Sequence, residues 1–116
     1  MNDDGLDMPL NRIVGATAMD LRLEINGQSR SVAWTSVESI YASIAVRDDN
    51  IPIMAFEIQD GRTRRSLIVG QVDAVWAELK AVLHIGLPEA VPVDVWERAL
   101  ADMPMVLAIF LRNWVR

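Results

Sequence analysis

The spacing of apolar residues changes once along this chain. Between residues 20 and 69, apolar and polar residues alternate in short runs, as in strands with one buried face. From Val72 onward, apolar residues recur every three or four positions, which is the period of an amphipathic helix. Strands grouped first and helices last indicate an antiparallel meander with helices packed on one face.

Five extended segments fit the alternating pattern. Asn26-Gly27 and Asp60-Gly61 are strong hairpin signals, because Asn, Asp and Gly accept positive φ. Residues 48–50 (Asp-Asp-Asn) supply another turn. Residues 37–47 also fit a helical stripe, but their β-branched content favours a strand. The predicted strands are residues 20–25, 28–34, 37–47, 51–59 and 62–69.

Two helices follow, and a third is one of two possibilities. The clearest helix covers about 13 residues from Val72, and we expect Gly86 to end it in the left-handed conformation. A second helix is predicted from near Pro92 to about Asp102. Residues 105–114 form either a third helix or a buried strand, since a short apolar run fits both. The stripe of the first helix is Val72, Val75, Trp76, Leu79, Val82 and Leu83.

The predicted fold class is therefore α+β: an antiparallel meander of about five strands, followed by two or three C-terminal helices packed on one face. The chain has 116 residues, a typical length for one domain. Residues 1–12 contain three Asp, a Gly and a Pro without apolar periodicity, so we expect a mobile acidic leader there. Residues 13–116 are expected to form a single domain.

This order of elements resembles that of PH-like domains, over roughly residues 20–88. The resemblance extends to small bacterial proteins of that superfold, and it implies a partial barrel closed by a helix. Members of the class bind lipids, peptides or proteins, so no ligand or functional residue is implied. The chain differs in having five predicted strands where a PH domain has seven, and in continuing through residues 89–116. The resemblance is carried by Trp34, Val37 and Ile40, by the Asp60-Gly61 hairpin, and by Trp76, Leu79 and Leu83.

Charge and composition narrow the range of functions. The net charge of −5 argues against nucleic-acid binding, which needs a basic face. The chain has no Cys, so disulfides, thiolate nucleophiles and cysteine-bound metals are excluded. Acidic residues follow Met1, and the longest apolar run, residues 105–111, is far shorter than the roughly 20 residues of a membrane span. We therefore expect a cytoplasmic protein without a membrane span.

Few residues suggest chemistry. His84 is the single His, and its place at a helix C-terminus is typical of a dipole-stabilising residue. The sequence predicts no catalytic residue, no metal site and no cofactor. Arg62, Arg64 and Arg65 form the densest basic group and are candidates for contact with an anion or acidic partner. The alternative is a solvated hairpin in which a turn at Asp60-Gly61 sets Glu57 opposite Arg64.

Apolar content points to a partner. The apolar share exceeds that of an ordinary domain, so we expect some apolar surface to contact a protein, including a second copy in a homodimer. The alternative is that the C-terminal segment folds back over the sheet. The predicted function is a non-catalytic binding or interaction module. Alternatives are a toxin-neutralising protein of the immunity type and an enzyme that uses Asp48, Asp49 or Glu57. The interface candidates are Met105, Leu107, Phe110, Leu111 and Trp114.

Overall fold

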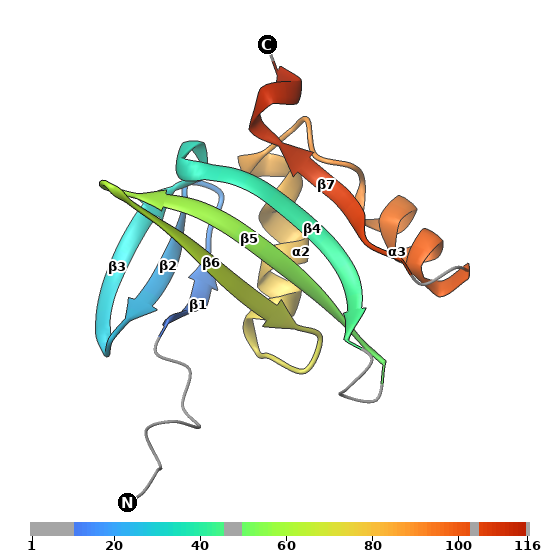
Figure 1. Ribbon diagram of the computed structural model, residues 1–116, viewed down its shortest axis with the longest axis horizontal. Helices are drawn as coiled ribbons and strands as arrows, with labels where there is room; N and C mark the ends of the chain where they lie inside the picture. The colour runs from blue at the N-terminus through green and yellow to red at the C-terminus, as the bar shows by residue number, and fades with distance from the viewer. Residues whose placement is uncertain (1–10, 46–49, 103–104, 116) are drawn as a thin grey trace, which may run out of the picture.

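The computed structural model describes residues 11–45, 50–102 and 105–115 (Figure 1). Within these ranges the protein has two antiparallel sheets, of order β1-β2-β3 and β6-β5-β4-β7, and two α-helices. The strands are β1 (Asn11–Ala16), β2 (Asp20–Ile25), β3 (Gln28–Ala33), β4 (Val37–Ala45), β5 (Ile51–Asp60), β6 (Thr63–Gly70) and β7 (Leu107–Leu111). The helices are α2 (Val75–Gly86) and α3 (Val93–Asp102), with 3-10 turns η1 (Trp34–Ser36) and η3 (Arg112–Val115).

The predicted α+β class and antiparallel pairing are confirmed, but the single five-stranded meander is wrong. The turn η1 interrupts the ladder between β3 and β4, so the chain passes from one sheet to the other there. Asn11 and Arg12, which we expected in the leader, begin β1 instead. Residues 1–10 lie outside the described residues. The C-terminal apolar run supplies β7, which pairs with β4 after both helices.

The two predicted hairpins differ in outcome. Asn26 and Gly27 have φ of 51° and 85°, so both turn residues are left-handed as predicted. In the second hairpin Asp60 pairs with Thr63, so the turn residues are Gly61 and Arg62 rather than Asp60 and Gly61. Gly61 has φ of 65°, which matches a turn with Gly at its first central position. This places every pair of the β5–β6 ladder differently from our prediction.

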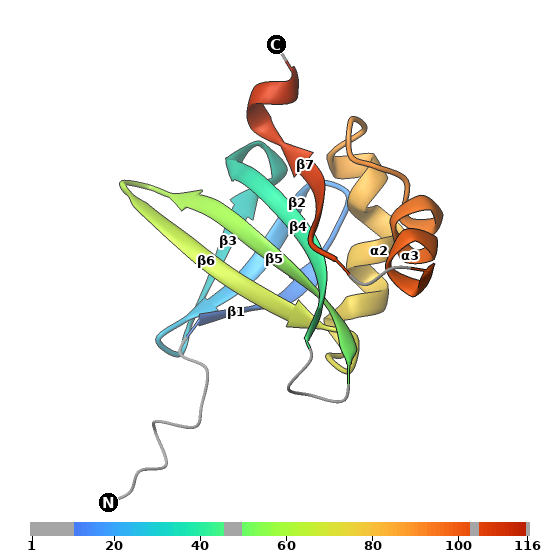
Figure 2. The same cartoon turned by 45° about the vertical axis from the view of Figure 1, so that its right-hand side comes forward.

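One core fills the space between the sheets and α2. Figures 1 and 2 show α2 running across the inner side of both sheets. Trp76, Leu79 and Leu83 of the predicted stripe are buried in this core. Val72, which we also placed in the stripe, precedes the helix and is 76% exposed. The helix begins three residues later than predicted, so Val72 belongs to the surface.

Gly86 has a packing role. It is the last residue of α2, with Leu87 as the cap, and it does not have the positive φ that we predicted. The buried indole of Trp34 lies against it, and a Cβ at residue 86 would overlap the ring. The Trp34 Nε1 donates a hydrogen bond of 2.8 Å to the Thr17 carbonyl, which fixes the ring in place. Glycine is therefore required here because helix and indole approach closely.

The C-terminal segment packs against the rest of its own chain. Phe110 of β7 pairs with Ile40 of β4, and both Phe110 and Ile109 are fully buried. The outer edge of β7 is covered at its centre, because the Val91 N–H donates to the Ile109 carbonyl at 2.9 Å. This is the alternative in which the segment folds back. Phe110, one of our interface candidates, is thus a fully buried core residue of the single chain.

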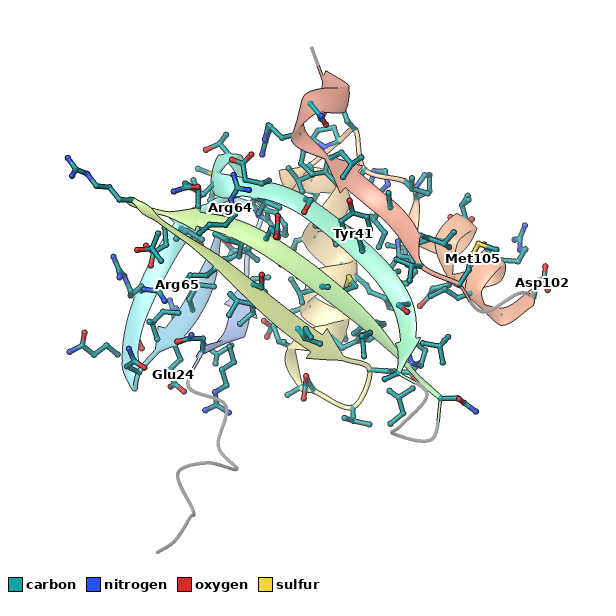
Figure 3. All side chains as sticks on the ribbon, in the orientation of Figure 1. Glu24, Tyr41, Arg64, Arg65, Asp102 and Met105 are labelled. Atoms are coloured by element: carbon teal, nitrogen blue, oxygen red, sulfur yellow. The ribbon has the colours of Figure 1, made fainter. Side chains whose placement is uncertain are left out.

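The contribution of Phe110 to the core can be measured as a change in the free energy of unfolding. We expect Phe110→Ala to lower the free energy of unfolding by about 3–5 kcal/mol, because it removes a buried aromatic ring and leaves a cavity. Met105→Ala is the matched control, since Met105 is 42% exposed just before β7 (Figure 3) and should cost less than about 1 kcal/mol. Urea unfolding compares the two variants. Equal, small losses would contradict a core position for Phe110.

A second substitution tests the contact between α2 and Trp34. Ala is the better helix former by about 1 kcal/mol, yet we expect Gly86→Ala to destabilise the protein by about 1–3 kcal/mol through overlap with the indole. The melting temperature should fall by about 4 °C or more. Gly70→Ala is the control, because a Cβ there meets no atom closer than 3.8 Å. A raised melting temperature for Gly86→Ala would show that the close approach is wrong.

Candidate ligand-binding cleft

A hollow of about 530 Å³ lies between α3 and the end of the second sheet where β4 finishes and β5 begins. We call it the α3 cleft. Its walls come from three distant parts of the chain: the facing ends of β4 and β5, the residue after β6, and one side of α3. The lining residues are Ile44, Asn50, Pro52, Gln71, Trp96, Glu97, Leu100 and Ala101.

The sheet wall is fixed by backbone pairing. Ile44 of β4 pairs with Pro52 of β5, and the Pro52 carbonyl accepts a hydrogen bond of 2.9 Å from the Gln71 N–H. Gln71 is therefore held beside Pro52, although the two residues are nineteen positions apart in the sequence. Asn50 has φ of 58°, a left-handed conformation that Asn tolerates better than most residues. These contacts place two side-chain amides, Asn50 and Gln71, at the cleft.

The helix wall is aromatic and held from behind. Trp96 and Leu100 lie one turn apart on α3 and are both buried. The Trp96 ring meets Trp76 of α2 edge to face, with centroids 6.2 Å apart and planes at 85°. This is a favoured geometry for an aromatic pair. Neither indole nitrogen has a hydrogen-bond partner among the described residues, so the pair is held by packing. Ala101, next to Leu100, is exposed and small.

Charge at the cleft is limited and compensated. Glu97 is the charged side chain among the described lining residues. Its Oε2 accepts a hydrogen bond of 2.6 Å from Nζ of Lys80, which lies on α2 outside the cleft. The ion pair joins α2 to α3 and holds the Glu97 carboxylate at the side of the cleft that faces Lys80. The cleft therefore presents apolar walls, two amides and a paired carboxylate.

The three arginines that the sequence grouped do not form one site. Arg62 is exposed in the turn of the β5–β6 hairpin. Arg64 lies on the outer face of the sheet, with its Nη1 3.9 Å from Oε1 of Glu57 (Figure 3). We predicted that Glu57 would lie directly opposite Arg64. Instead Glu57 pairs with Ser66, so its contact with Arg64 is diagonal. Arg65 lies on the opposite face, as strand alternation requires.

Arg65 has a structural partner. Its Nε donates a hydrogen bond of 2.9 Å to Oδ2 of Asp60, a buried carboxylate at the end of β5. Arg30 of β3 reaches the same oxygen at 3.1 Å. Because β3 belongs to the first sheet and β6 to the second, Asp60 joins the two sheets electrostatically. We therefore do not assign Arg65 to a ligand site.

A polar groove lies on the outer face of the second sheet. It measures about 660 Å³ and is wide open. Arg112, its most enclosed cation, donates to the Val37 carbonyl at 2.7 Å and to the Trp34 carbonyl at 3.1 Å, and it lies over the Phe110 ring. The other charged residues of the groove, Glu38, Glu57 and Arg64, carry both signs of charge, and water competes for their interactions. The lining residues are Glu38, Ser39, Tyr41, Glu57, Arg64, Leu111, Arg112 and Asn113.

The remaining sequence candidates are dispersed. Met105 is exposed, while Leu107 and Leu111 are half-buried on β7. Asp48 and Asp49, and the side chain of Trp114, lie outside the described residues. His84 is exposed in the last turn of α2. Sequence reasoning missed the α3 cleft because Trp96 and Leu100 have the ordinary spacing of a core stripe, and nothing local indicates that the sheet ends beside them.

The described residues contain no group of three or more His, Asp or Glu side chains that could hold a metal ion. Neither α2 nor α3 is long and apolar enough to cross a membrane, and no other described helix is. Comparisons with protein-family models, with curated proteins and with solved structures found no match to this chain.

Proposed function

We propose that the protein is a non-catalytic binding module that holds a small, neutral, mostly apolar molecule in the α3 cleft. The observation that carries the proposal is the cleft itself, a concave and largely apolar space of about 530 Å³. Small-molecule sites have this character and usually measure about 300–1,000 Å³. Release of water from the apolar walls supplies the main driving force for binding.

The lining residues define the chemistry of the ligand. An apolar ring or short chain fits against Ile44, Pro52 and Ala101, the apolar lining residues that keep exposed surface, with the buried Trp96 and Leu100 behind them. A polar end of the ligand has hydrogen-bonding partners in Asn50 and Gln71, since each amide both donates and accepts. The Glu97 carboxylate disfavours an anionic ligand. A neutral molecule with one hydrogen-bonding end matches all of these features.

Several features support binding over catalysis. The lining carboxylate is held in an ion pair with Lys80, and the other described lining side chains are apolar groups or amides. Apolar groups and amides orient a ligand and have no proton to exchange near neutral pH. We keep the resemblance to PH-like domains as a hypothesis about layout, supported by two packed antiparallel sheets with a helix across them. The cysteine-free sequence supports a cytoplasmic location.

Filling the α3 cleft should weaken ligand binding. Nile red, a neutral apolar dye whose emission rises and shifts to the blue in apolar surroundings, is the probe. We expect saturable binding to the unmodified protein. Ala101→Phe places a ring in the cleft from an exposed helix position, and it should weaken dye affinity by roughly 10-fold or more, or about 1.4 kcal/mol.

The matched control is Ala77→Phe, an equally bulky change at an exposed position of α2 that does not line the cleft. It should bind the dye as the unmodified protein does. Melting curves check that both variants are folded. Absence of saturable binding to the unmodified protein, or equal affinity in the two variants, would contradict the α3 cleft as the ligand site.

A further inference from the structure

An apolar patch lies on the opposite side of the sheet from the core. Leu67 and Val69 of β6 point inward and are buried, whereas Ile68 between them is 62% exposed. Val72, just after β6, and Val14 of β1 are exposed beside it. Large aliphatic side chains grouped on the surface are unusual in a monomer and commonly mark an interaction site. We call this surface the Ile68 face.

Two hollows flank the Ile68 side chain. One, of about 430 Å³, extends toward the start of β5, and its lining includes Gly70, which has no side chain, and Ala45, whose side chain is short. The other, of about 300 Å³, extends toward β1 and the start of α2. The first is lined by Ala45, Ile51, Ile53, Ile68, Gly70, Val72 and Asp73. The second is lined by Asn11, Arg12, Ile13, Val14, Ile68, Asp73, Ala74 and Val75.

We propose that the Ile68 face binds a second copy of this chain in a two-fold dimer. The same surface carries a projecting apolar side chain and a hollow of apolar residues beside it. A two-fold axis brings each Ile68 to the hollow of the other copy, which is how a surface becomes complementary to itself. Both copies then bury Ile68 and Val72 together.

The charges of the face fit the same partner. Asp73 lines both hollows, and Arg12 lines the second. The Arg12 side chain is half exposed even though it contacts Glu24. Because Arg12 and Asp73 line the same hollow, the face carries charges of both signs, and a second copy can set Arg12 of one chain against Asp73 of the other beside the apolar centre. A face with charge of one sign would repel its own copy.

The C-terminal segment is not involved in this dimer. Its apolar residues Ile109 and Phe110 are in the core, whereas the Ile68 face is formed by β1, the end of β4, β5, β6, the turn before α2 and the first residue of α2. The face shares no lining residue with the α3 cleft. The dimer and the proposed ligand site therefore stand or fall separately.

Sedimentation equilibrium of the full chain tests the proposal. Because the apolar patch occupies only part of the outer surface, we expect a weak dimer, with the mean mass rising from 13.0 kDa toward twice that value between about 5 and 500 μM. Ile68→Arg introduces a charge at the centre of the contact in both copies. It should raise the dissociation constant by roughly 100-fold or more.

The control is Ile85→Arg, since Ile85 is 61% exposed on α2 and lines neither hollow. It should associate as the unmodified protein does, and so should Ala101→Phe. Melting curves establish that each variant is folded. A mass of 13.0 kDa for the unmodified chain at every concentration would overturn the dimer. Equal association of the Ile68→Arg and Ile85→Arg variants would overturn the Ile68 face as its site.

Discussion

The contact between the Trp34 indole and the bare backbone of Gly86 sets the arrangement of the whole chain. Trp34 lies where the chain leaves the first sheet for the second, and its ring fits only because residue 86 has no side chain. Its indole N–H is bound by Thr17 and its carbonyl by Arg112. One residue therefore joins the β1–β2 turn, the end of α2 and the segment after β7.

The α3 cleft is a consequence of how α2 is held. With α2 fixed across the sheets, Trp76 supports Trp96 from behind, and Lys80 holds Glu97. These contacts position α3 beside α2, while β4 and β7 provide the sheet against which it rests. The helix does not cover the end of the sheet completely, and the space left beside Pro52 is the cleft.

The apolar residues of the sequence divide between the interior and the surface. Both sheets and α2 bury one continuous core, and the C-terminal run completes it through β7. Of the exposed apolar residues, Val14, Ile68 and Val72 lie together on the Ile68 face, while others such as Met19, Ile85 and Val106 are dispersed. The α3 cleft and the Ile68 face take neighbouring residues, such as Ile44 and Ala45, at the same end of the second sheet. A concave apolar space suits a small ligand, whereas a projecting side chain beside a hollow suits a protein surface, so the two sites have different expected partners.

The sequence by itself determined the features that depend on neighbouring residues. The Asn26-Gly27 turn follows from backbone freedom at two positions, and the buried stripe of α2 with Trp76 follows from helical periodicity. Tertiary structure alone decided the pairing of β7 with β4, the role of Gly86 and the assembly of the α3 cleft. In each of these, residues far apart in sequence meet, as Phe110 meets Ile40 and Trp34 meets Gly86. Local periodicity carries no information about such pairs, because it specifies which face of a segment is buried and not what covers it.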